Sequence, residues 1–192
     1  MRIIAGSWRG RRLVTAAGST TRPTADRVRE AVFSSLTSAL GGWEGVRVLD
    51  AFAGSGALGL EALSRGAAHA MFFERDRKAL DALRSNIERC GAGEHTTVVP
   101  RDVLKPGSVT ALAEPVSLLL LDPPYRIDKA KVRGLIEALI ASEALAEGGL
   151  VVWEHASSDA VELPERVRLL GHKEYGSTAI ELAVVDADGG DR

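Results

Sequence analysis

The chain has 192 residues, of which 45% are hydrophobic and 26% are charged, so it is long enough to bury the core of an ordinary domain. Its amino-terminal segment contains no apolar signal region, and its longest aliphatic run, Leu118–Leu121, is too short to cross a bilayer. The single cysteine, Cys90, excludes an internal disulfide framework and is typical of a reducing compartment. We therefore expect a cytoplasmic protein without membrane contact.

Positive charge is concentrated at the amino-terminal end. Residues 1–29 contain seven arginines and one acid, Asp26, which gives a net charge of +6 against −8 for the remainder. A basic end on a mildly acidic body is typical of an arm that binds a polyanion. A solvated, arginine-rich hairpin without a ligand fits the same charges, so charge alone leaves both interpretations open.

The amino-terminal part of the chain predicts a small extension. Residues 2–14 alternate in polarity around two glycines, which favours a short β-hairpin or an extended arm, and residues 15–21 are small and polar, as in a loop. Thr24 is expected to cap a helix that runs to about Leu40, where Gly41-Gly42 would end it.

From residue 46 onward the pattern alternates between strands and helices, which predicts an α/β fold with a doubly wound, mostly parallel sheet of about seven strands. The expected strands are 46–50, 70–74, 96–99, 116–122, 150–154, 167–170 and 179–184, the last two forming an antiparallel pair. The expected helices are 57–65, 76–89, a segment after Asp102, and 129–141. We expect an extension over 1–42, one main domain over 43–185 and a disordered tail over 186–192.

The first of these strands runs into a glycine-rich turn, Asp50–Gly59, with the sequence DAFAGSGALG. Glycines let the backbone approach a ligand closely, and doubly wound sheets bind ligands beyond the carboxyl ends of their strands. Glu74 ends the second strand, where its carboxylate would accept hydrogen bonds from both hydroxyls of a ribose. Asp102 follows the third strand and would face an adenine. The turn therefore predicts a nucleoside-containing ligand.

The glycine turn leaves two other interpretations open. Gly54 to Gly59 also satisfies the dinucleotide pattern GxGxxG, and Glu74 lies 20 residues beyond Gly54, as in an NAD-binding domain. A tight turn without any ligand is the simpler alternative.

The fourth strand ends in Asp122-Pro123-Pro124-Tyr125, and two prolines cannot continue a central strand. The exocyclic amine of a base is a poor nucleophile because its lone pair is delocalised into the ring. The Asp122 carboxylate and the Pro123 carbonyl could accept both of its N–H groups, while Tyr125 offers a ring face to a base taken out of its stack. An ordinary β-turn is the alternative for these four residues.

The two motifs together resemble those of class I S-adenosylmethionine-dependent amino-methyltransferases. Further segments are similar to one family, the bacterial 16S ribosomal RNA guanine-N2 methyltransferases. They are RIIAG (2–6), WRGR (8–11), RPTADRVRE (22–30) and FAGSGALGLEALSR (52–65). The resemblance covers nearly the whole chain and is strongest before Asp76.

The resemblance implies a Rossmann-like catalytic domain over 43–185 that methylates a guanine N2 in 16S ribosomal RNA, in a partly assembled small subunit, and acts as a monomer. The implied cofactor-binding residues are Asp50, Ala53, Gly54, Gly56, Glu74, Asp102 and Val103. The implied catalytic residues are Asp122, Pro123, Pro124 and Tyr125. The implied RNA-binding residues, within an RNA-facing extension over 1–42, are Arg9, Arg11, Arg12, Arg22 and Arg27, with Arg126 as a further candidate. Arg22-Pro23-Thr24 would also close the methionine end of the cofactor, and Trp8 would either stack on RNA or pack within the hairpin.

Three rival functions keep some support from the sequence. An adenine-N6 or other amino-methyltransferase acting on DNA or another RNA would use the same Asp122 chemistry, although no separate domain for reading a duplex is visible. A nicotinamide oxidoreductase would use the glycine turn and give Asp122–Tyr125 no role. A catalytically silent RNA-binding assembly factor would need neither the glycine turn nor Asp122–Tyr125. We expect no metal, because the histidines lack the spacing of a metal site: His69, His95, His155 and His172.

Overall fold

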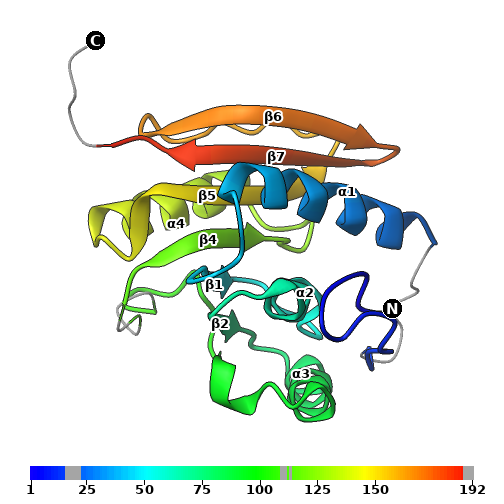
Figure 1. The fold of residues 1–192 in the computed structure, drawn as a ribbon. Coiled ribbons are helices and arrows are strands. Elements are labelled where there is room, and N and C mark those ends of the chain that lie inside the picture. Colours follow the sequence, from blue (N-terminus) through cyan, green and yellow to red (C-terminus); the bar gives the residue numbers. More distant parts are fainter. Residues whose placement is uncertain (16–22, 109–111, 113, 188–192) are drawn as a thin grey trace. The chain divides into compact units, whose positions relative to one another are not determined.

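The computed structural model describes residues 1–15, 23–108, 112 and 114–187 (Figure 1). These residues form two compact units, Met1–Asp102 and Val103–Arg192, which we call the first and the second unit. Among the described residues, no helix is long and apolar enough to span a membrane.

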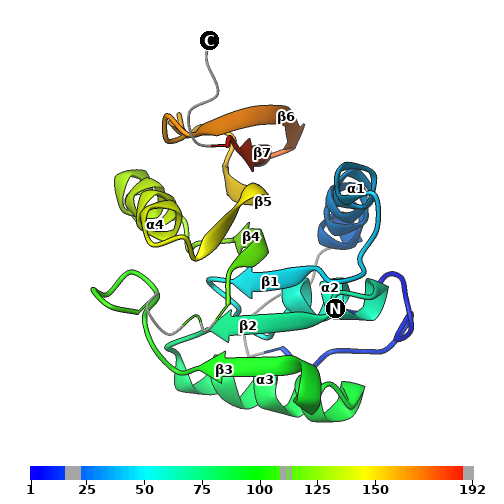
Figure 2. The same ribbon diagram turned by 60° about the vertical axis from the view of Figure 1, so that its left-hand side comes forward.

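The first unit contains three parallel strands and the helices that connect them. Its elements are α1 (Pro23–Leu40), β1 (Arg47–Asp50), α2 (Ala57–Arg65), β2 (His69–Phe73), α3 (Arg77–Cys90), η1 (Gly93–His95) and β3 (Thr96–Val99). The strands lie in the order β3-β2-β1, and Figure 2 shows them side by side with their arrowheads in the same direction. The carboxyl ends of all three strands therefore meet at one edge, which is where the sequence places the glycine turn and Glu74.

Helices α2 and α3 begin and end close to where the sequence predicts. Helix α2 ends at Gly66, which adopts a left-handed conformation with φ 114°. The carboxylate of Asp76 caps α3 by accepting the N–H of Ala79. The expected third strand matches β3 at both ends.

Helix α1 differs from the prediction at its start. It begins at Pro23, so Thr24 lies inside its first turn and the predicted Thr24 cap is wrong. Proline is favoured at the first helical position because the N–H it lacks would have no partner within the helix there. Val28, Val32, Leu36 and Leu40 recur every fourth residue along α1, and the first three of them are buried, so the helix has an apolar face.

The second unit contains a four-stranded, mixed part of the sheet. Its elements are β4 (Val116–Leu121), α4 (Lys129–Ala141), β5 (Leu145–Ala156), β6 (Val167–Tyr175) and β7 (Thr178–Val185). The strands lie in the order β4-β5-β7-β6, with β4 parallel to β5 and β7 antiparallel to both of its neighbours. The predicted doubly wound, mostly parallel α/β fold and its antiparallel carboxyl-terminal pair are thus confirmed.

Two predicted strand boundaries in the second unit are wrong: the start of β5, and the end of β6, which is expected at residue 170 and lies at Tyr175. Strand β5 begins at Leu145 rather than at residue 150, because it pairs with Val116 before a bulge that contains Gly148. Gly148 and Gly149 at this point favour a loop in the sequence pattern, so the strand is predicted to begin only after them. Residues 103–108 form turns, and the helical segment expected after Asp102 otherwise falls on residues 109–113, of which 109–111 and 113 lie outside the described part. The division into extension, main domain and tail stays a prediction, and residues 188–192 of the tail lie outside the described part.

The amino-terminal residues form the expected hairpin, which is held by backbone hydrogen bonds such as that from the Leu13 N–H to the Met1 carbonyl (3.1 Å). The hairpin is anchored on α2, where Ser64 Oγ accepts the Trp8 N–H (3.0 Å) and donates to the Ala5 carbonyl (2.6 Å). We call residues 1–15 the hairpin.

A buried carboxylate provides the second anchor of the hairpin. The Glu61 side chain has no exposed surface, and it accepts the N–H groups of Ile4 (2.7 Å) and Ala5 (3.0 Å). Its remaining partners are two guanidinium groups, Arg65 at 2.8 Å and Arg29 at 4.0 Å. A charge taken out of water is tolerated when it is paired and hydrogen-bonded in this way.

We predict that Glu61→Ala lowers the free energy of unfolding by about 3–5 kcal/mol, because it removes the shared acceptor of the buried Arg29, the half-buried Arg65 and two backbone N–H groups. Urea denaturation followed by circular dichroism measures the loss. The matched control is Glu88→Ala, an exposed acid on α3, which should change stability by less than about 0.5 kcal/mol. A loss for Glu61→Ala as small as that of the control would contradict the anchoring role.

Candidate active site

The glycine turn connects β1 to α2 and leaves open space above its backbone. Gly56 precedes the first residue of α2 with φ 81°, and a Cβ at this position would lie 2.4 Å from Cδ1 of Leu83. Residue 56 must therefore be glycine, both for its backbone conformation and for the packing of α3. A Cβ added at Gly54 would meet nothing within 4 Å, so a ligand can approach the backbone there.

Two carboxylates fix the conformation of this turn. Asp50 is buried at the end of β1, and its Oδ2 accepts the N–H of Gly59 (3.0 Å). Glu74 follows β2, and its Oε2 accepts the N–H of Gly54 (2.8 Å) while Oε1 accepts the N–H groups of Arg75 and Asp76 (2.7 Å each). Oε1 thus accepts two N–H groups and Oε2 only one, so Oε2 keeps a lone pair for another donor, such as a ribose hydroxyl.

The structure brings five of the predicted cofactor-binding residues together at the ends of β1 and β2. They are Asp50, Ala53, Gly54, Gly56 and Glu74. Asp102 is linked to this group through Arg75, whose Nη1 lies 2.6 Å from Asp102 Oδ2. Val103 is the first residue of the second unit and is buried. An open backbone beside a half-buried carboxylate suits the ribose of a nucleoside.

The Asp-Pro-Pro-Tyr segment forms a turn at the end of β4, in the second unit. The N–H of Ile127 donates to the Pro124 carbonyl (2.8 Å), and Pro123 is buried whereas Pro124 is exposed. The Tyr125 ring is 56% exposed, and its hydroxyl lies 3.4 Å from Oγ1 of Thr178 at the start of β7. The tyrosine thus offers an accessible aromatic face that is tethered at its hydroxyl end.

A second acid, Glu154, lies beside Asp122 and is not among the residues predicted from the sequence. Strands β4 and β5 pair Leu121 with Trp153, so Asp122 and Glu154 are the next residues of two neighbouring parallel strands. The Asp122 side chain reaches solvent, yet enough protein surrounds it that lost hydration raises the pKa of this carboxyl to about 6. Lost hydration, followed by repulsion from Asp122, raises the pKa of Glu154 to about 8. At neutral pH the coupled pair is expected to keep one proton.

We predict that Glu154→Gln leaves the melting temperature unchanged near pH 4 and raises it at pH 8. The folded-state pKa of Glu154 lies above that of the unfolded chain, so ionisation of the unfolded chain removes stability as pH rises from about 4.5 to about 8. Glutamine cannot ionise and avoids this loss. Thermal melts at both pH values measure the effect, with the exposed Glu165→Gln as control. Parallel curves for wild type and Glu154→Gln would refute the raised pKa.

The predicted RNA-binding arginines are solvent-exposed where the structure describes them. Arg9, Arg12 and Arg27 form no ion pair with any described residue, and the Arg11 guanidinium donates to the Arg89 carbonyl at the end of α3. Arg22 lies outside the described residues. Trp8 is half-buried in the hairpin, a placement compatible with either of its expected roles.

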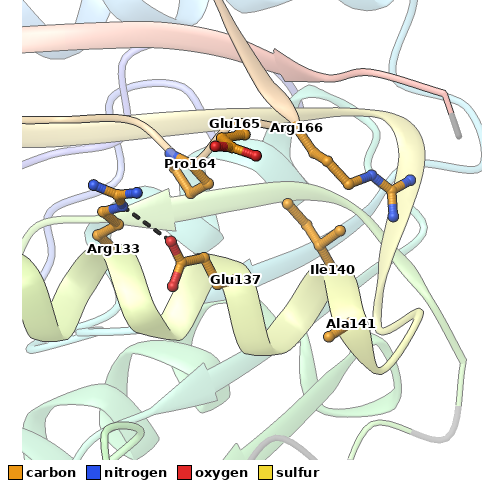
Figure 3. Close-up of a pocket in the computed structure, with 7 residues that line it drawn as sticks. All are labelled: Arg133, Glu137, Ile140, Ala141, Pro164, Glu165 and Arg166. Carbon is orange, nitrogen blue, oxygen red and sulfur yellow. Dashed lines mark hydrogen bonds and ion pairs between the residues drawn. The ribbon is translucent and has the colours of Figure 1, made fainter. Parts of the chain in front are cut away.

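A separate pocket of about 280 Å³ lies between α4 and the segment that leads into β6 (Figure 3). Ile140 and Pro164 line it together with charged side chains. Its arginines already have acidic partners, because Arg133 pairs with Glu137 and Arg166 pairs with Glu147. The pocket contains none of the predicted site residues. Among the described residues, no group of three or more potential ligands could hold a metal ion.

Comparison with known proteins gives matches along almost the entire chain. The model of a family described as Conserved hypothetical protein 95 matches residues 1–184. YlbH of Bacillus subtilis, named as a candidate rRNA methyltransferase, is 39% identical over 186 residues, covering 95% of this chain and 97% of the relative. Ribosomal RNA small subunit methyltransferase D of Escherichia coli is 36% identical over 197 residues, covering 98% and 92%. The solved structure of the Escherichia coli protein yhhF, named as a candidate methyltransferase, matches with a TM-score of 0.81 at 33% identity, covering 98% of this chain and 99% of that chain.

Proposed function

Because the chain belongs to the Conserved hypothetical protein 95 family, we propose that it transfers a methyl group from S-adenosylmethionine to the exocyclic N2 of a guanine in 16S ribosomal RNA of the small subunit. The observation that carries this proposal is the nearly end-to-end match to ribosomal RNA small subunit methyltransferase D. The expected class I methyltransferase fold is confirmed by the match to yhhF.

The first unit would hold the cofactor. Bound S-adenosylmethionine would supply an electrophilic methyl group, and its sulfonium would become a thioether when the methyl group is lost. Glu74 would accept hydrogen bonds from the ribose hydroxyls, since its carboxylate is already oriented by three backbone N–H groups. Gly54 would let the ligand lie against the backbone, and Asp102 with Val103 would flank the adenine.

The second unit would activate the methyl acceptor. The Asp122 carboxylate and the Pro123 carbonyl would each accept one N–H of the guanine amine, which favours a more pyramidal nitrogen with a localised lone pair. The amine would take the methyl group from the sulfonium of the bound cofactor, and the Asp122 carboxylate would accept the proton that the nitrogen then loses. A pKa of about 6 keeps Asp122 ionised at neutral pH and still makes it a better base than an ordinary aspartate. Tyr125 would stack on the base.

The extension over residues 1–42 would face the RNA, with its exposed arginines on phosphates. The main domain over 43–185 would carry the cofactor-binding and catalytic residues. We further propose that the substrate is a partly assembled small subunit and that the protein acts as a monomer in the cytoplasm.

The proposal is tested with undermethylated small subunits from a strain that lacks the gene, incubated with purified protein and labelled S-adenosylmethionine. We expect N2-methylguanine in 16S ribosomal RNA with wild-type protein. With Asp122→Ala we expect a loss of at least about a hundredfold in rate, because an acceptor for the amine is removed. Binding of S-adenosylhomocysteine, measured by calorimetry, should persist in this variant. Label in duplex DNA alone would support the rival amino-methyltransferase, and near-normal turnover by Asp122→Ala would remove its assigned role.

We also predict that Arg11→Ala combined with Arg12→Ala weakens RNA binding and flattens its salt dependence. Each lost phosphate contact should reduce the slope of log K against log salt by about 0.7–0.9. Fluorescence anisotropy titrations at several salt concentrations measure the slope, with the exposed Lys131→Ala on α4 as control. An unchanged slope in the double variant would take the hairpin out of the interface.

A further inference from the structure

A buried amide joins the hairpin to the glycine turn within the first unit. Asn86 lies on α3 and has no exposed surface. Its Oδ1 accepts the N–H of Val14 (2.7 Å), and its Nδ2 donates to the carbonyls of Val14 (2.8 Å) and Ser55 (2.9 Å). Both amide hydrogens and the amide oxygen are therefore used by backbone groups from two other parts of the chain.

The two backbone segments that share this amide have different predicted tasks. Ser55 lies between Gly54 and Gly56 in the turn whose Gly54 N–H is held by Glu74. Val14 lies at the end of the hairpin, two residues beyond the exposed Arg12. Displacement of the hairpin would leave the Asn86 oxygen without its donor, inside the protein, and would free the amide to turn away from Ser55. An unsatisfied buried polar group is costly, so the two contacts should form and break together.

We infer that Asn86 is a positioning residue that couples docking of the hairpin to the conformation of the glycine turn. The inference rests on the proposed function for the identity of the ligand, and it adds that the hairpin supports cofactor binding even without RNA. Because coupling between two sites is reciprocal, a ligand at the glycine turn also strengthens docking of the hairpin.

The first test measures binding of S-adenosylhomocysteine by calorimetry in the absence of RNA. Val14→Pro removes the N–H that Asn86 accepts, whereas Val14→Ala keeps it and serves as the matched control. We expect Val14→Pro to weaken binding at least about fivefold, the lower end of ordinary coupling, and Val14→Ala to bind within about twofold of wild type. A contact that served stability alone would lower the melting temperature and leave the affinity of the folded protein unchanged, which would overturn the inference.

The second test needs no variant and therefore does not depend on folding of Val14→Pro. Amide hydrogen exchange is followed in wild-type protein with and without saturating S-adenosylhomocysteine. We expect the Val14 amide to exchange more slowly with the ligand, because it is protected only while the hairpin is docked on Asn86. Equal exchange in both states would overturn the inference alone. A wild-type protein that binds no S-adenosylhomocysteine would overturn the proposed function, and the inference with it.

Discussion

The buried carboxylate of Glu61 is the interaction on which the arrangement of the first unit depends. It collects two backbone N–H groups from the hairpin and two guanidinium groups, one of them from Arg29 on α1. Helix α2 begins directly after the glycine turn, so the helix that follows the turn also carries the hairpin and contacts α1. A buried charge requires its full set of partners, so Glu61 holds the hairpin, α1 and α2 together.

Local signals explain which parts of the fold could be predicted. The glycine turn and the bounds of α2 and α3 are each indicated by a few neighbouring residues, and the structure places them close to where the sequence predicts. The predicted start of β5 failed because a bulge hides the strand, and the Thr24 cap failed because Pro23 already begins α1. In both cases the deciding factor was backbone geometry, which residue type indicates only weakly.

The least predictable residues are those whose partners are distant in sequence. Glu61 and Ser64 belong to the segment after the glycine turn, and nothing within that segment indicates that they hold residues 4–8. Asn86 is an ordinary helix residue until the fold brings Val14 and Ser55 to it. Glu154 had a usable signal, since an acid follows an apolar strand run just as Asp122 does, but only the β4–β5 register places the two side by side. The assignment of Asp122 itself rested on the chemistry of an unusual local motif, and it stays a proposal.

The way the hairpin is anchored has a consequence for how its sequence can diverge. Helices α2 and α3 bind the hairpin mainly through its main-chain atoms. These atoms are the N–H groups of Ile4, Ala5, Ser7 and Trp8 and both backbone groups of Val14. Main-chain anchors accept almost any side chain, apart from the buried Ile3 and Leu13 and from Gly6, where a Cβ would lie 1.7 Å from the Ser64 carbonyl oxygen. Most side chains of the hairpin can therefore change without loss of the contacts that attach it to α2 and α3.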